Sequence, residues 1–147
     1  MNSNMIKVVS LLSVIAGLIL GFLAIIPFVG AIAFWIVMCF TSVIVMIYLH
    51  RLRVLNLQSV NESAVVGFVS GFTSFIGFAI SYIPSVIILF KLFNIYPNYG
   101  ISVMLNNATF GVLVMFVIFV AVLSATVNAF FGFLTYYILN YLDNMNK

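Results

Sequence analysis

Charge is what this sequence has least of. Its 147 residues include five Lys and Arg and two Asp and Glu, so only 5% are charged, whereas 66% are hydrophobic and the mean hydropathy is +1.36. A soluble domain carries about a quarter charged residues. Because so few charged side chains cannot cover a surface in water, the sequence excludes an ordinary soluble domain and predicts an all-α protein solvated by the lipid bilayer.

Side chains that carry chemistry are scarce as well. The chain has one His, one Cys, one Glu and one Asp, all remote from one another in sequence, so no triad or ligand spacing exists. Cys39 lies in an apolar run and cannot form an internal disulfide, so we expect it to pack. No Asp, Glu, Lys or Arg lies deep in a predicted span, where ion-coupled transporters place an ionisable group. We therefore expect no catalytic residue, no metal and no cofactor, and the scattered basic residues predict no nucleic-acid binding.

Apolar runs occupy most of the chain and divide into four spans. No charged residue occurs from Val8 to Leu49. As one helix this run would be about 60 Å long, twice the ~30 Å hydrocarbon core, so it must reverse. Pro27 ends the first helix, and Gly30 supplies the backbone angles of the reversal. The predicted spans, at about 6–26, 31–48, 64–90 and 110–138, form two helical hairpins in a single domain, 1–147.

Three features of these spans need interpretation. The first apolar run is longer than the ~7–15 residues of a signal-peptide core, so we expect it to be retained.

Pro84 either kinks the third helix or marks its end. The connection 94–107 is rich in Asn, Tyr, Pro and Gly and is predicted to be an interfacial loop.

The few basic residues indicate the orientation. Lys7 precedes the first predicted span, and Arg51 and Arg53 follow the second. Lys147 follows the fourth, so an even number of crossings places all four on one side, against Lys91 alone on the other. The positive-inside rule then predicts N-in, C-in topology for a multi-pass protein of the cytoplasmic membrane.

The polar stretch between the second and third spans also has local roles. His50 and the two arginines close the second helix, where the helix dipole favours cations. Ser59 and Glu62 form an S-x-x-E capping box before the third apolar run. We interpret Glu62 as a cap rather than as a partner-binding residue, and we expect no metal at the isolated His50.

Small residues four apart predict where helices meet in lipid, because they let backbones approach closely. Gly17 and Gly21 carry this spacing in the first span, and Gly67 and Gly71 carry it in the third, where Gly77 follows on a nearby face. These five glycines are therefore the predicted helix-packing positions.

Asn128 is the most polar residue inside a predicted span. Ser and Thr can bond to carbonyls of their own helix, but a carboxamide cannot be fully satisfied in this way. We expect Asn128 to bond across an interface, in the bundle interior or with a copy of itself, at about 0.6–2 kcal/mol. A place in a solute pathway is the weaker alternative.

The segment 16–28 can be aligned on 66–78, which places Gly17 on Gly67 and Gly21 on Gly71. A duplicated two-helix hairpin would produce this match. Chance would produce it too, in a sequence so rich in Ile, Val, Phe, Leu and Gly.

Four parts follow one another along the chain: a glycine-rich first helix, the turn IIPF at 25–28, the basic edge YLHRLR at 48–53, and NESAVVGFVSGF at 61–72. In this order they are similar to small uncharacterised bacterial four-helix membrane proteins, in which the third helix begins E-x-A-x-x-G-x-x-x-G. Here Ser63 follows the glutamate. The resemblance implies a four-helix membrane fold and a bacterial source, and it implies no activity.

The sequence thus favours a non-enzymatic polytopic membrane protein that acts through helix contacts, as an accessory subunit or scaffold. Its partners would be the lipid bilayer and a copy of itself or another membrane protein. The alternative is a small oligomeric transporter or channel subunit for a neutral or apolar solute. Water access to Ser74, Ser81 and Ser124 would separate the two hypotheses.

Overall fold

The computed structural model describes residues 3–54 and 59–145, and all regular structure within them is helical. Lys147 lies outside the described residues. The elements are α1 (Ser3–Leu23), α2 (Val29–Trp35), the π-helical η1 (Ile36–Phe40), α3 (Thr41–Arg51), α4 (Val60–Phe93), α5 (Tyr99–Asn107) and α6 (Phe110–Met145).

Four helical stretches are long and apolar enough to cross a bilayer, which confirms the predicted number of spans. They are α1, the continuous run of α2, η1 and α3, then α4 and α6. The chain is therefore a multi-pass membrane protein, while its orientation in the bilayer stays a prediction.

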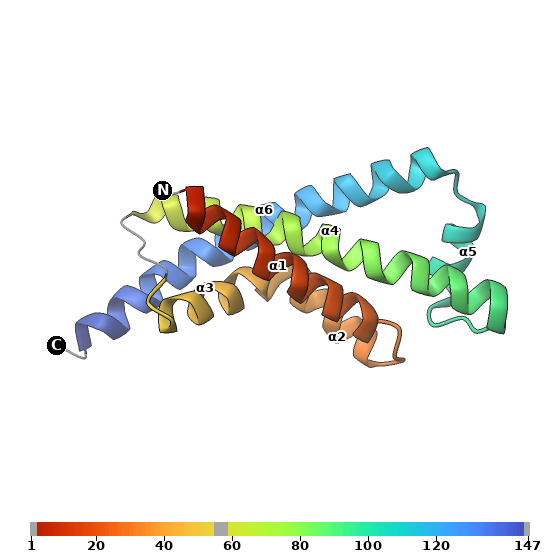
Figure 1. The fold of residues 1–147 in the computed structure, drawn as a ribbon, viewed down its shortest axis with the longest axis horizontal. Helices are drawn as coiled ribbons and strands as arrows, with labels where there is room; N and C mark the ends of the chain where they lie inside the picture. Colours follow the sequence, from red (N-terminus) through yellow and green to blue (C-terminus); the bar gives the residue numbers. More distant parts are fainter. Residues whose placement is uncertain (1–2, 55–58, 146–147) are drawn as a thin grey trace.

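Helix α4 is the centre of the bundle, with α1 and α6 as its two principal neighbours. Helix α1 packs mainly on α4 and only to a small extent on the helix that follows it, so the expected first hairpin is not a packing unit of its own. The start of α1 and the end of α6 lie at one end of the bundle (Figure 1). We call this end the terminal end, and the opposite end, with the α1–α2 turn and α5, the α5 end.

The reversal between α1 and α2 is made by Phe28. Its φ of 69° and ψ of −42° accompany a hydrogen bond of 2.9 Å from the Val29 N–H to the Pro27 carbonyl. This is the geometry of the rare γ-turn with positive φ. The assignment of the unusual backbone angles to Gly30 was wrong, because no described glycine has a positive φ. Gly30 instead allows close approach, since a Cβ there would overlap the Ala24 carbonyl.

Helix α4 continues past Pro84 to Phe93, which excludes the alternative that the proline ends the helix. The expectation of a loop at 94–107 was wrong, because this connection contains α5. The side-chain oxygen of Asn98 accepts a hydrogen bond of 3.2 Å from the Ile101 N–H and caps this helix.

Candidate functional site

The second crossing is interrupted near its middle by η1. In a π-helical turn the backbone N–H bonds to the carbonyl five residues earlier instead of four. Such turns are frequent at functional sites. The Thr41 hydroxyl donates toward the carbonyls of Ile36 and Val37, at 3.2 and 3.4 Å. Side chains of α6 also bond to the backbone of this segment, so the irregular turn and α6 form one unit.

Asn128 of α6 is fully buried, and its amide joins the backbone of the irregular turn to the first turn of α3. Its oxygen accepts a hydrogen bond of 2.8 Å from the Ser42 N–H. Its nitrogen lies 3.1 Å from the Val37 carbonyl and 3.0 Å from the Met38 carbonyl. It also lies 3.0 Å from the Ser124 carbonyl of its own helix. The structure therefore places Asn128 in the bundle interior.

Ser124 connects three helical segments at the same level. Its hydroxyl lies 3.1 Å from the Val37 carbonyl of η1 and 3.2 Å from the Gly71 carbonyl of α4. The approach depends on glycine, because a Cβ on Gly71 would lie 2.6 Å from the Ser124 carbonyl oxygen. We call this group the polar core: Val37, Met38, Ser42, Gly71, Ser124 and Asn128.

The predicted packing glycines divide between the two faces of α4. Gly17, Gly21 and Gly77 lie in the contact between α1 and α4. Gly67 and Gly71 lie in the contact between α4 and α6. A duplicated hairpin would give the aligned glycines of α1 and α4 equivalent partners, but those of α1 face α4, two crossings later, and those of α4 face α6, the next crossing. The packing gives no support to the duplication.

The charged residues of the terminal end lie at helix ends. The Ser59 hydroxyl accepts a hydrogen bond of 3.3 Å from the Glu62 N–H at the start of α4. His50 Nε2 lies 3.4 Å from Asp143 Oδ1, which joins the ends of α3 and α6. Sequence reasoning missed this contact because the two residues are remote along the chain. Lys7 lies near the start of α1, Arg51 ends α3 and Arg53 follows it, and their role in setting the topology stays a prediction.

No three His, Cys, Asp or Glu side chains come together within residues 3–54 and 59–145. The side chains of the polar core bond mainly to backbone groups of η1, α3 and α4.

Toward the α5 end, α4 and α6 separate around an apolar cavity of about 480 Å³, which we call the wedge cavity. Phe75 and Phe78 of α4 are buried in its wall. Phe28, Trp35 and Phe116 also line it and are exposed, so the cavity reaches the surface of the bundle. Ligand sites in proteins commonly have volumes of about 300–1,000 Å³ and apolar walls, and this cavity falls within that range.

No protein-family model matches the chain, and no curated protein or solved structure is significantly similar to it. The resemblance to bacterial four-helix proteins stays a prediction. Function has to be inferred from the polar core, the wedge cavity and the surface of the helices.

Proposed function

We propose that this protein is a non-enzymatic accessory subunit or scaffold of the cytoplasmic membrane, which binds another membrane protein through helix contacts. One observation carries the proposal. In the part of α6 nearest the α5 end, from Phe110 to Phe119, no residue is buried. The segment is almost entirely apolar, so it is stable in lipid, and a neighbouring helix could pack along it without displacing any contact of the bundle.

One side of this segment points away from the wedge cavity. Met115 is 75% exposed and Phe119 is 63% exposed, and neither lines the cavity. Gly111 and Val122 lie on the same side at helical spacing, and a Cβ on Gly111 would meet nothing within 4 Å. A glycine with open space beside it permits close approach of a partner backbone. We call these four residues the α6 outer face.

The polar side chains favour a scaffold over a conducting pathway. Ser74 and Ser81 are buried, and each hydroxyl donates a hydrogen bond of 3.1 Å to its own helix, to the Gly71 and Phe78 carbonyls. The Ser124 hydroxyl bonds to the Val37 and Gly71 carbonyls of the polar core. The polar core lies between the wedge cavity and the terminal end. The wedge cavity itself is the observation that favours the alternative, a transporter subunit for an apolar solute.

Photocross-linking tests the scaffold. A photoreactive amino acid at Met115 should give one discrete protein adduct in the native membrane, and the same group at Leu11, which is 63% exposed on α1, should give lipid adducts only. The Met115 adduct should be lost in Gly111→Leu, which fills the open space without touching the bundle. Lipid adducts alone at Met115, or the same protein adduct at both positions, would reject this face as the contact site.

Thiol labelling tests the alternative and the orientation together. In a Cys39→Ala background, cysteines at Ser74, Ser81 and Ser124 should stay unreactive toward membrane-impermeant reagents. Reaction at these positions would favour the transporter. A cysteine at the exposed Asp143 serves as the control, and N-in, C-in topology requires that it react only from the cytoplasmic side.

A further inference from the structure

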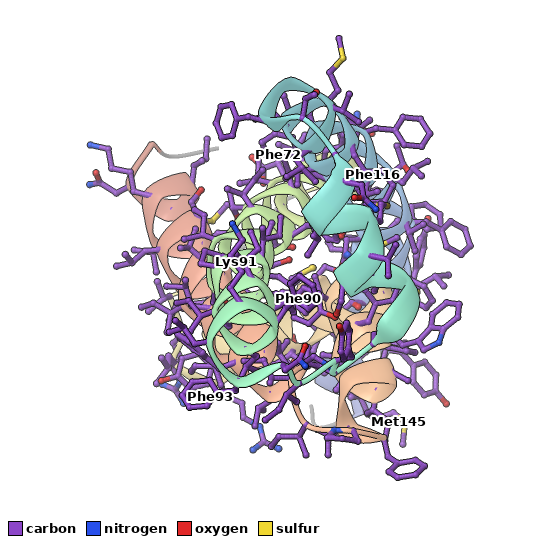
Figure 2. The ribbon with its side chains drawn as sticks, turned by 90° about the vertical axis from the view of Figure 1, so that its right-hand side faces the viewer. Phe72, Phe90, Lys91, Phe93, Phe116 and Met145 are labelled. Atoms are coloured by element: carbon purple, nitrogen blue, oxygen red, sulfur yellow. The ribbon has the colours of Figure 1, made fainter. Side chains whose placement is uncertain are left out.

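A second cavity, of about 210 Å³, lies between the end of α4 and α5. Its lining includes Val86, Phe90 and Lys91 of α4 and Ser102 and Leu105 of α5, and we call it the Lys91 cavity. Figure 2 looks onto the α5 end and shows Phe90 and Lys91 at this end of α4, with α5 across from them. Two polar groups of this lining, the Ser102 hydroxyl and the Lys91 ammonium, can still bind a ligand.

The first group is the Ser102 hydroxyl. The residue is 1% exposed, and its Oγ has no hydrogen-bond partner. The buried serines of α4 differ, since Ser70 and Ser74 donate to carbonyls of their own helix at 3.0 and 3.1 Å. A buried hydroxyl without a partner is costly, and a ligand in the cavity that accepts its hydrogen bond would remove that cost.

The second group is the Lys91 ammonium. The chain has only two acidic residues, Glu62 and Asp143. Glu62 lies in the first turn of α4, about 44 Å along the helix from Lys91. Asp143 lies at the terminal end beside His50. Neither acidic side chain can therefore neutralise Lys91, and an anionic lipid head group at the membrane surface would supply the missing negative charge.

The two cavities follow one another in the order that a phospholipid requires. Along α4, the Lys91 cavity is lined from Val86 to Lys91, near the helix end, and the wedge cavity is lined from Phe75 to Ile83, deeper in the bundle. Leu105 lines both. A phosphate held at Lys91 would thus direct an attached acyl chain along α4 toward the aromatic wall of the wedge cavity.

We propose that one anionic phospholipid binds at the α5 end. Its phosphate lies between the Lys91 ammonium and the Ser102 hydroxyl, and one acyl chain fills the wedge cavity. A zwitterionic lipid brings its own cation close to the phosphate and gains less from Lys91. The site lies on the opposite side of α6 from the α6 outer face, so the proposal does not depend on the scaffold function.

Native mass spectrometry of the full chain released from nanodiscs tests the head-group contact. From discs of equal phosphatidylglycerol and phosphatidylcholine, the protein should retain one phosphatidylglycerol. Lys91→Gln should lower the retained fraction about tenfold, as expected for loss of a charge-assisted hydrogen bond. Ser102→Ala should lower it less, and Lys7→Gln, the matched change at the terminal end, should leave it unchanged. Equal retention of both lipids, or equal retention by Lys91→Gln and wild type, would overturn the proposal.

Two cavity-filling variants test the acyl chain. Ala79→Phe fills the wedge cavity from α4 and Leu113→Trp fills it from α6, since both residues line it. Each variant that keeps the wild-type helical signal and melting temperature should lose the bound phosphatidylglycerol. Retention of the lipid by such a variant would show that the chain lies elsewhere. Millimolar inorganic phosphate should not displace the lipid, and displacement would mean that the site recognises free phosphate and that the lipid proposal is wrong.

Discussion

At Gly71, α4 and α6 touch backbone to backbone, and the Ser124 hydroxyl donates a hydrogen bond across the contact to the Gly71 carbonyl. Nearer the α5 end, the same two helices separate around a cavity of about 480 Å³, with Phe75 and Phe78 in its wall. Both regions are apolar by composition. They differ in the size of the contacting residues. At Gly71 the residues are small enough for the backbones to meet, and at Phe75 and Phe78 they are large enough to hold the helices apart.

This difference separates two tasks of a membrane protein. Lipid tails are as apolar as the side chains, so helices associate through close packing and hydrogen bonds rather than through the hydrophobic effect. The terminal half, with the contacts of Gly67 and Gly71 on α6 and the polar core, should therefore carry most of the stability. The α5 half, with its cavities, should tolerate change and bind other molecules. Four substitutions, each with a matched control, test this difference.

The largest effect is expected at Gly71. In Gly71→Ala, the new Cβ would lie 2.6 Å from the Ser124 carbonyl oxygen, which forces α4 and α6 apart. We expect the free energy of unfolding in detergent to fall by about 3 kcal/mol, at the upper end for overpacking. Gly111→Ala is the matched control, because nothing lies within 4 Å of its Cβ, and it should gain up to about 1 kcal/mol from helix propensity. Equal unfolding midpoints for the two variants would refute the backbone contact.

A slightly smaller loss is expected from Asn128→Leu. The substitution removes the acceptor of the Ser42 N–H and the donor to the Val37 and Met38 carbonyls, all within the bundle. Leaving a buried polar group unpaired costs about 1–3 kcal/mol, so we expect a loss of about 2–3 kcal/mol. Hydrogen exchange of 36–44 should accelerate as well.

Asn140→Leu is the same chemical change at an exposed position of the same helix, and it should alter neither quantity. If both leucine variants behave alike, the amide of Asn128 does not hold η1. Because Asn128 holds the fold together, loss of a partner complex in Asn128→Leu would not identify Asn128 as a docking residue.

The third comparison places one larger side chain in each half. Ala125 is fully buried, with its Cα 3.0 Å from a Cβ built on Gly71, whereas Ala79 lines the wedge cavity. Ala125→Leu should lower the free energy of unfolding by about 1–2 kcal/mol, and Ala79→Leu should change it by less than about 0.5 kcal/mol. Thermal unfolding of both variants in the same detergent measures the difference. A larger loss for Ala79→Leu would show that the wedge cavity is not available space.

Much of the fold could be predicted because lipid imposes simple rules. The absence of charge and the position of Pro27 were enough to identify four spans, and the carboxamide of Asn128 was correctly expected to need a partner across helices. Hydropathy identifies the solvent of a segment but does not say which side of a helix faces which neighbour. That is why the packing of α1 on α4 could not be predicted.

Other features depend on contacts remote in sequence. The π-helical turn of η1 is bonded by α6, so the residues 36–40 alone carry no sign of it. Helix α5 was missed because Asn98 and Gly100 resemble loop residues, although Asn98 is in fact the helix cap. The Lys91 cavity exists because α5 folds back on α4, so that Ser102 and Lys91 line the same space. In the sequence, Lys91 could be interpreted only as a charge that affects topology.

The smallest effect, and one of opposite sign, is expected at the α1–α2 turn of the α5 end. Phe28 holds a φ of 69° in a γ-turn, and its side chain is 93% exposed, so the strain is not offset by packing within the bundle. Such backbone strain costs about 1–3 kcal/mol in a residue with a Cβ, and glycine relieves it at some cost in chain entropy. Phe28→Gly should therefore raise the free energy of unfolding by about 1 kcal/mol. Val29→Gly, at the first residue of α2, should lower it by about 0.5–1 kcal/mol, because a helical position gains nothing from glycine. Thermal unfolding of both variants in the same detergent measures the difference, and equal destabilisation by the two glycines would show that the turn at Phe28 is not strained.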